Sequence, residues 1–496
     1  MKISKLVLLG ILSIFLTLNS TMGLLAQGID SVSVERLKSF VNTLASDEYE
    51  GRLVGTKGND LASEFIINQL KRINVKPINN SYTQNFEFTT GIQYGKGCNV
   101  TFTKLVEREG LPVDMWRKSD KKWTLGTEWL PMSFSDNATV SGELAFVGYG
   151  ITATDNSYDD YAGLDVKGRV VIVLTDSAIE SPRDKFFGQY ADLKYKAENA
   201  KKHGAVGVIF IKALSDSANT FYPQNPEEMI NKPGIVVIQA TRTDIAQFFA
   251  RNQMLYPSEL EINAKKKPKS FLIPYSSVSI SVDISPEVKT IHNIVGVIEG
   301  TEKKDNYILV SSNFDYLGRE LKIPKYRKLP AQLLKGADDN ASGVAVAMEL
   351  ACRLSANPLP YSVIFVFFNA KEKNNFGSDF FINHPVIPFN QIQLCLNLNM
   401  LGRLRTNKIS IYGTNKLPEI KEIFSKFSIP EGLNPQFFDE FGISGDDKVL
   451  SRSIPVVTLS TGTTEDHRKY TDLPDKINYE GMYKITNFII SFLKGK

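Results

Sequence analysis

The sequence predicts an α/β protein, in which a mixed, mostly parallel sheet is covered by helices and a β-rich segment is inserted into the chain. Three observations indicate this fold class. Two amphipathic helical patterns open the chain, strand-like apolar runs dominate from about 130 to 260, and strands alternate with helices from about 286 onward. Such alternation is typical of parallel strands joined by helical crossovers. A chain of 496 residues exceeds one hydrophobic core, and its length favours about three domains.

The first 26 residues have the pattern of a signal peptide. Lys2 and Lys5 precede the apolar run Leu6–Leu18, and a cleavage position follows between Ala26 and Gln27. The run is short for a bilayer span, and an uncleaved N-terminal anchor is the alternative interpretation. No Cys lies near the cleavage position, which argues against a lipoprotein. We therefore expect export to the periplasm or the extracellular space, with no membrane span after cleavage.

Two helices are predicted before residue 77, separated by a Gly-rich loop over residues 50–58. Ser33 is the expected N-cap of the first helix, and Asn59 or Asp60 that of the second. Their apolar positions recur at helical spacing and are Val34, Leu37, Val41, Leu44, Leu61, Phe65, Leu70 and Ile73.

Short apolar runs between Gly, Pro and Asn predict strands in the middle of the chain. The predicted strands are Gly142–Gly150, Arg169–Leu174, Val206–Ile211 and Ile235–Ile238. A helix is predicted over Ala191–His203 and a loop over 222–233. The resulting boundaries are 27–95 for the N-terminal part of the main domain, 96–285 for the insert with its core at about 130–260, and 286–496 for the rest of the main domain.

The last segment alternates between strand and helix patterns. Helices are predicted over Ala341–Leu354 and from Tyr479 onward. The predicted strands are Asn293–Ile298, Tyr307–Ser311, Val363–Phe368, Leu394–Leu398, Ile409–Tyr412 and Val456–Leu459. In parallel sheets of this kind, functional sites form beyond the carboxyl ends of the strands.

Composition excludes some classes of partner. A net charge of +4 and a pI near 8.6 are too mild for nucleic-acid binding, which needs basic residues clustered on one face. The densest basic run, Lys265–Lys267 with Lys269, is expected to be a solvated loop. Whether two of the three cysteines, Cys98, Cys352 and Cys395, form a disulfide is open.

Several motifs follow one another in a characteristic order. Outside the insert these are Leu44–Arg52 (LASDEYEGR), Gly336–Gly343 (GADDNASG), Asn397–Arg403 (NLNMLGR) and Asp475–Met482 (DKINYEGM). Inside it they are Phe146–Gly150 (FVGYG), Asp165–Gly168 (DVKG) and Gly204–Ile209 (GAVGVI). The first set resembles the M28 family of zinc peptidases, which contains aminopeptidases and glutamate carboxypeptidases. The second set resembles the protease-associated (PA) domain that some members insert. The resemblance covers nearly the whole mature chain and implies an M28-like sheet with an inserted PA domain.

The resemblance implies a site for two zinc ions, with His and carboxylate ligands and a separate Glu that takes a proton from metal-bound water. Of six matching positions, two keep the family's carboxylates: Asp339 at the bridging ligand and Glu372 at a second ligand. The other four are replaced, by Asn313, Asn399 and Arg468 at ligand positions and by Lys371 at the general-base position.

The replacing side chains are poor substitutes for the family's residues. A neutral amide binds zinc weakly, a guanidinium does not bind it in this role, and an ammonium accepts no proton unless it is strongly desolvated. His467, next to Arg468, and Asp315 are the candidate ligands of a rebuilt zinc site. The remaining histidines, at positions 203, 292 and 384, occupy no ligand position and are expected at surface or capping positions.

The charges favour replacement of the metals over random decay. In the family site, four carboxylates are offset by two divalent ions. Here Asp339 and Glu372 would be offset by Lys371 and Arg468. Because buried carboxylates without a counter-charge are costly, we expect the two cations to stand where the metals would stand, with no cofactor bound.

The function expected from the resemblance is that of an inactive peptidase homologue that binds a peptide or protein ligand. Lys371 and Arg468 are candidate residues for binding a ligand carboxylate. The alternative is a metal-dependent aminopeptidase with a rebuilt or single-metal site, and a purely structural exported protein is a third class. The sequence leaves the ligand and the oligomeric state open.

Overall fold

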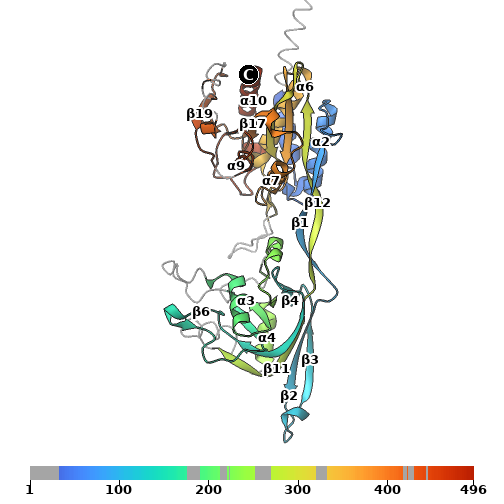
Figure 1. Cartoon of the computed structure of the whole chain (residues 1–496), viewed down its shortest axis with the longest axis vertical. Helices are drawn as coiled ribbons and strands as arrows, with labels where there is room; N and C mark the ends of the chain where they lie inside the picture. The colour runs from blue at the N-terminus through green and yellow to red at the C-terminus, as the bar shows by residue number, and fades with distance from the viewer. Residues whose placement is uncertain are drawn as a thin grey trace, which may run out of the picture. The chain divides into compact units, whose positions relative to one another are not determined.

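A computed structural model of the chain divides into two compact units (Figure 1). The first unit comprises Met1–Phe88 and Thr290–Lys496, and the second comprises Thr89–Lys289. The structure describes residues 33–175, 190–212, 221–222, 224–251, 270–319, 332–416, 420, 422, 429–442 and 445–495. The expected signal peptide and the basic run at Lys265–Lys269 lie outside the described residues. Within the described residues, no helix is both long and apolar enough to span a bilayer.

An eight-stranded mixed sheet forms the centre of the first unit. Its order is β1 (Thr83–Tyr94), β12 (Ile284–Ile298), β16 (Tyr361–Phe368), β13 (Lys303–Asn313), β17 (Ile392–Leu398), β20 (Val456–Ser460), β18 (Lys408–Tyr412) and β19 (Asn434–Phe438). Strands β16, β13, β17 and β20 are parallel to their neighbours in this series, whereas β12 and β18 pair antiparallel at its two sides. The predicted α/β fold class is confirmed.

Helices cover both faces of this sheet, which is why the middle of its central strands is apolar on both faces. Ile308 and Val310 of β13 pack in one core cluster, and Leu309 between them packs in another. The first cluster includes side chains of the helix at 33–44, α2 (Lys57–Arg72), α6 (Gly343–Ala356) and α10 (Tyr479–Gly495). The second includes side chains of α7 (Phe376–Asn383) and α9 (Asp446–Leu450).

The start of α2 differs from the prediction. Its N-cap is Thr56, and Asn59 and Asp60 lie inside the first turn. Asn59 is buried, and its amide donates to the carbonyl of Arg52 and exchanges hydrogen bonds with Asn369. Because these tertiary bonds engage the Asn59 side chain, it does not cap the helix.

The second unit contains another eight-stranded sheet. Its order is β3 (Arg117–Trp123), β2 (Asn99–Val106), β11 (Phe271–Ser281), β5 (Thr139–Phe146), β8 (Val170–Leu174), β9 (Gly207–Ile211), β10 (Val236–Ala240) and β4 (Trp129–Pro131). Helices α3 (Leu193–Lys202) and α4 (Arg242–Arg251) belong to the same unit. The prediction missed β2, β3 and β11, which lie outside the expected core at 130–260. Strand β3 is mostly exposed and polar, so it shows no apolar alternation.

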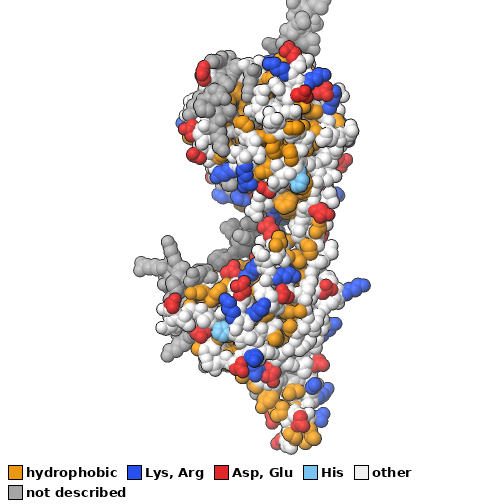
Figure 2. Space-filling model, in the orientation of Figure 1, with side chains coloured by type: hydrophobic (Ala, Val, Ile, Leu, Met, Phe, Trp, Pro, Cys, Tyr) orange, Lys and Arg blue, Asp and Glu red, His pale blue; other side chains and the backbone are white. Residues whose placement is uncertain are grey.

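The hairpin of β2 and β3 ends in exposed apolar side chains (Figure 2). Leu111, Val113 and Met115 are 43%, 43% and 56% exposed, respectively. Trp116 packs its ring against Tyr275 with the centroids 4.8 Å apart. The apolar side chains at the tip therefore lie largely on the surface of the unit and contribute little to its core.

Asp160 is a buried carboxylate of the second unit. It accepts hydrogen bonds from the backbone N–H groups of Tyr149 and Ile151, at 3.1 and 3.0 Å, and from the hydroxyl of Tyr158 at 3.1 Å. Burial nevertheless raises its pKa from 3.8 to about 7. The folded unit therefore keeps a proton that the unfolded chain releases above about pH 4. This stabilising contribution is complete below the unfolded pKa and is lost as the pH rises toward 7.

We expect Asp160→Asn to flatten the pH dependence of unfolding of the second unit between about pH 5 and 8. The amide oxygen can accept both backbone hydrogen bonds, and the amide nitrogen can donate to the Tyr158 hydroxyl. All three tryptophans (Trp116, Trp123 and Trp129) lie in this unit, so tryptophan fluorescence in urea titrations follows it. In the native chain, the free energy of unfolding of the second unit should fall by up to a few kcal/mol from about pH 5 to pH 8. If the free energy of unfolding changed equally with pH in the native chain and in Asp160→Asn, the raised pKa of Asp160 would be contradicted.

Candidate functional site

The candidate residues gather at one edge of the first-unit sheet. Strands β13, β16, β17 and β20 are mutually parallel neighbours, so their carboxyl ends meet there. In the register, Asn313 at the end of β13 lies opposite Phe368 at the end of β16, and Leu398 of β17 lies opposite Leu459 of β20. The segments that leave these strands carry all of the positions singled out in the sequence.

The bridging position, Asp339, lies in the irregular turn η6 (Ala337–Ser342) that precedes α6. Gly336 begins this turn with a φ of 57°, and a Cβ there would lie 2.3 Å from the carbonyl oxygen of Asp339. Arg52, which is 1% exposed, donates to the carbonyl oxygens of Gly336 and Lys335 at 3.0 and 2.7 Å. It also donates to those of Leu44 and Phe314. Burial lowers the pKa of Arg52 to about 10. The Arg of the early motif therefore anchors the loop that carries Asp339.

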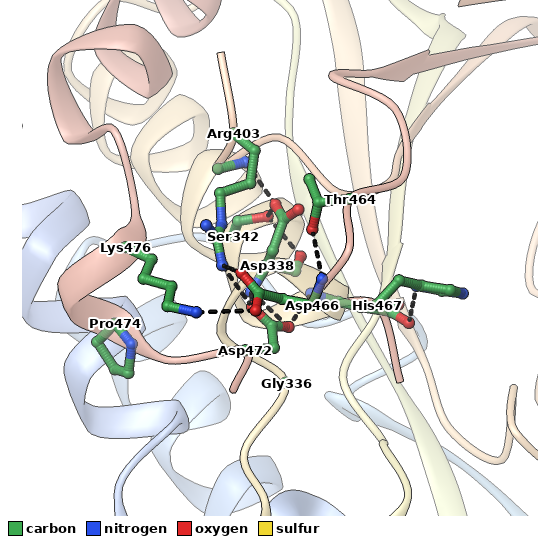
Figure 3. Close-up of polar contacts among 12 residues, drawn as sticks. Gly336, Asp338, Ser342, Arg403, Thr464, Asp466, His467, Asp472, Pro474 and Lys476 are labelled. Carbon is green, nitrogen blue, oxygen red and sulfur yellow. Dashed lines mark hydrogen bonds and ion pairs between the residues drawn. The ribbon is translucent and has the colours of Figure 1, made fainter. Parts of the chain in front are cut away.

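A second network of polar contacts holds the same turn (Figure 3). The carboxylate of Asp472 accepts the backbone N–H groups of Asp338 and Asp339 at 3.0 and 3.1 Å. Nη2 of Arg403 lies 3.0 Å from Asp466 and 3.5 Å from Asp472, and Nζ of Lys476 lies 2.8 Å from Asp466. Figure 3 shows these side chains converging from three segments. The position of Asp339 is thus fixed by buried polar contacts.

Four charged side chains meet at the centre of the site. Nζ of Lys371 lies 2.8 Å from Oε1 of Glu372 and 3.5 Å from Oδ1 of Asp339. Nη2 of Arg468 lies 2.5 Å from Oε2 of Glu372. The Asp339 and Glu372 side chains are 3% and 5% exposed, and that of Lys371 is 15% exposed. Each carboxylate therefore contacts at least one cation, and we call these four residues the ion cluster.

The electrostatics of Lys371 favour its charged form. Burial acts to lower the pKa of its ammonium, but the carboxylates of Asp339 and Glu372 outweigh burial, and the net pKa is raised above its ordinary value. A lysine with a raised pKa stays protonated at neutral pH. It can neutralise carboxylates there, but it cannot accept a proton from water.

Asp315, predicted as a substitute ligand, has another role in the structure. It is fully buried, and its two carboxylate oxygens accept the backbone N–H groups of Lys371 and Glu372, both at 3.0 Å. Burial raises its pKa to about 7, and the nearby charge of Glu372 adds to the shift. Asp315 thus positions the Lys371–Glu372 backbone.

The two asparagines that the resemblance matches to ligand positions differ in their surroundings. The amide oxygen of Asn313 accepts a hydrogen bond from Nδ2 of Asn340 at 3.0 Å, and its Nδ2 donates to the carbonyl of Asp315 at 3.2 Å. Oδ1 of Asn399 is buried and has no hydrogen-bond partner among the described residues. Asn399 also lines a small cavity of about 140 Å³ beside Met400 and Asp447.

The structure brings His467 to the site together with Arg468. Nδ1 of His467 lies 3.4 Å from Oδ2 of Asp339, and it is buried without a hydrogen-bond partner among the residues that the structure describes. Arg468 has a φ of 58°, and the two neighbouring side chains reach different carboxylates. Both candidates for the last ligand position therefore lie at this site, Arg468 as a member of the ion cluster and His467 next to its Asp339. Of the other histidines, His292 differs from its expected surface or capping place: it lies inside β12, 2.5 Å from Oγ of Ser63.

The donor set does not fit a two-zinc centre. The space between Asp339 and Glu372 contains the ammonium of Lys371, and the guanidinium of Arg468 contacts the outer oxygen of Glu372. Within the described part of the chain, no group of three or more His, Cys, Asp or Glu side chains is arranged to hold a metal ion. The three cysteines, none of which lies in the ion cluster, are all free.

Sequence reasoning missed the support behind the site. Arg403 and Asp472 lie within or near quoted motifs, but nothing in their spacing indicates that they share one buried network. The role of Arg52 was also hidden, because its partners are backbone carbonyls, which carry no sequence signal. A basic residue inside a Gly-rich segment, flanked by apolar helices, is the one hint that the sequence offers.

Comparison with known proteins supports the resemblance drawn from the motifs. Residues 293–493 match the model described as Peptidase family M28, and residues 140–248 match the PA domain. The resemblance to this family with a PA domain is thereby confirmed.

Two curated proteins are similar over part of their length. Glutamate carboxypeptidase 2 homolog of Caenorhabditis briggsae is 23% identical over 317 residues, which are 53% of this chain and 37% of that protein. Aminopeptidase YwaD of Bacillus subtilis is 25% identical over 215 residues, or 42% of this chain and 38% of that one. This chain spans half or less of the length of the curated relatives it matches.

Among solved structures, a zinc aminopeptidase from Bacillus subtilis resembles most of the chain. The likeness covers 92% of this chain and 94% of that one, with a TM-score of 0.52 and 16% sequence identity. At this identity the comparison shows a shared fold.

Proposed function

The chain is a homologue of peptidase family M28 that carries a PA domain, and we propose that it is an exported protein that binds a peptide or protein ligand without hydrolysing it. The proposal rests on one observation: Lys371 and Arg468 pair with the two carboxylates that a metal centre would use. The support for export is the N-terminal pattern of the sequence.

The absence of hydrolysis follows from the chemistry of the side chains. In a metallopeptidase, a carboxylate near the metal takes the proton of the attacking water. The residue at that position is Lys371, whose pKa is raised by its anionic neighbours. No step that needs a base can therefore be assigned to it.

The ligand-binding part of the proposal concerns Arg468. Its side chain is 55% exposed although Nη2 contacts Glu372, so other N–H groups of the guanidinium can donate to a ligand. A guanidinium is suited to bind a carboxylate through two parallel hydrogen bonds. We propose that the C-terminal or an acidic side-chain carboxylate of a peptide binds there.

A pool of random hexapeptides tests this part of the proposal. We expect immobilised protein to retain peptides with a free C-terminal carboxylate better than the same pool synthesised as C-terminal amides. Arg468→Ala should reduce retention of the carboxylate pool about tenfold, which corresponds to one charge-assisted hydrogen bond. The matched control is Lys469→Ala, which removes the adjacent exposed cation. Equal retention of both pools, or an equal effect of both variants, would contradict a carboxylate site at Arg468.

One observation favours a second candidate function, a metal-dependent aminopeptidase with a rebuilt site. Nδ1 of His467 is buried 3.4 Å from Asp339, without a partner among the described residues. If Lys371 swung away, His467, Asp339 and Glu372 could ligate one ion. This candidate still lacks a general base, and we rank it second for that reason.

A further inference from the structure

A second cavity of the first unit lies among the ends of four helices. Its volume is about 610 Å³, which is within the range of small-molecule sites. It is lined by side chains of the helix at 33–44, of α2, of α6 and of α10. Its floor is apolar, and Phe40 and Leu354, only 5% and 1% exposed, are part of it. This cavity can bury a hydrocarbon group.

The cavity is separate from the ion cluster. Helix α6 begins directly after the loop that carries Asp339, whereas the residues of its last turn line the cavity. A helix of 14 residues rises about 21 Å. The two sites share no lining residue, so they can be tested independently.

The polar lining of the cavity has one sign of charge. Four cationic side chains line the cavity: Arg36, Arg72, Arg353 and Lys494. Among the described residues that line it, none is Asp or Glu. Glu349, which is fully buried and does not line the cavity, pairs with Arg36 at 2.7 Å and with Arg353 at 3.0 Å. One carboxylate thus offsets two cations.

The positive charge of the four lining cations exceeds the negative charge of Glu349 and of the helix C-terminal ends. Arg72, Arg353 and Lys494 lie in the last turns of α2, α6 and α10, where a cation complements the helix dipole. Each helix end carries about half a negative charge, so three ends and Glu349 together leave an excess of about one and a half positive charges. In the described residues, neither Arg72 nor Lys494 forms an ion pair. An anion would complete this balance.

We propose that this cavity binds an amphipathic carboxylate, namely a medium-chain fatty acid. Its hydrocarbon chain would lie on the apolar floor, and its carboxylate would face Arg72 and Lys494. An anion without an apolar body would leave the floor hydrated, and an alcohol would leave the cations unpaired. The combination of an apolar floor and an acid-free, basic rim therefore selects this class of ligand.

Calorimetric titration of the purified protein with octanoate, decanoate and dodecanoate tests the proposal. We expect one molecule bound per chain and an affinity that rises about threefold to fourfold for each added methylene that is buried. Decanol should bind at least tenfold more weakly than decanoate, because it cannot pair with the cations.

Two cavity variants test separately the contributions of the cations and of the free volume to decanoate binding. Arg72→Ala/Lys494→Ala should weaken decanoate binding at least tenfold, whereas Lys57→Ala/Lys408→Ala, which removes two exposed lysines outside the cavity lining, should not change it. Ile490→Trp, at a partly buried position of the lining, should abolish binding by filling the space. No binding by the native chain would overturn the proposal, and so would equal affinities of decanoate and decanol. An unchanged affinity in both cavity variants would overturn it as well.

Discussion

Purified protein that is incubated with zinc and then desalted should retain far less than one ion per chain. The reason is the donor set of the ion cluster. Lys371 and Arg468 present cations where a zinc ion would need lone pairs, and both contact the surviving carboxylate of Glu372. Binding of a divalent ion would first require that these pairs break. Elemental analysis after desalting measures the bound metal directly.

A restored variant provides the matched control for this measurement. Asn313→His, Lys371→Glu, Asn399→Asp and Arg468→His together return the His and carboxylate donors that the family uses, and the change should give stoichiometric zinc. Circular dichroism establishes that the variant is folded. Two tightly held ions per chain in the native protein would end the proposal of a metal-free cluster.

The same preparations decide between binding and hydrolysis. A chromogenic aminoacyl substrate with added zinc, cobalt or manganese should give no turnover by the native chain, because Lys371 cannot act as a base. Turnover that Asp339→Ala abolishes would instead favour the rebuilt aminopeptidase, with His467 as a ligand. Turnover that survives Asp339→Ala would indicate a contaminating peptidase.

The predictable part of the fold is the part in which each strand is buried on both faces. The run at Val363–Phe368 is apolar throughout, that at Tyr307–Ser311 is apolar up to Ser311, and both lie in central strands. Strand β3 could not be predicted in this way, because its side chains are largely solvated and its pairing with β2 is set by backbone hydrogen bonds. Such edge strands carry little periodicity.

The residues of the candidate site can be predicted from the sequence where a recognisable motif identifies their positions. The contacts of Lys371 and Arg468 were inferred from a charge count, and the structure has these residues within 3.5 Å of Asp339 or Glu372. Asp315 was not predictable as a positioning residue, since its partners are backbone N–H groups of a loop that closes only in three dimensions. Side chains that bind the backbone of distant segments are hidden from the sequence in general.

Replacing Lys371 by methionine should destabilise the first unit by about 3–5 kcal/mol. Methionine keeps much of the apolar stem of the lysine but removes its charge. Asp339 then loses the ammonium at 3.5 Å, and Glu372 keeps only the partly exposed Arg468. Removal of one partner from a buried ion pair leaves an uncompensated charge, and this cost is of that size. Urea titration followed by circular dichroism reports on both units, whereas tryptophan fluorescence reports on the second unit alone. We expect the midpoint to shift in circular dichroism and to stay unchanged in fluorescence.

Lys373→Met is the matched control, because Lys373 is an exposed lysine two residues further along the same loop. We expect it to change the free energy of unfolding by no more than about 0.5 kcal/mol. Adding Glu372→Gln to Lys371→Met should restore part of the lost stability, because it removes one of the carboxylates left without their lysine. If Lys371→Met costs no more than Lys373→Met, the carboxylates of Asp339 and Glu372 do not depend on the lysine. The charge argument for a metal-free site would then fail, whatever ligand the protein binds.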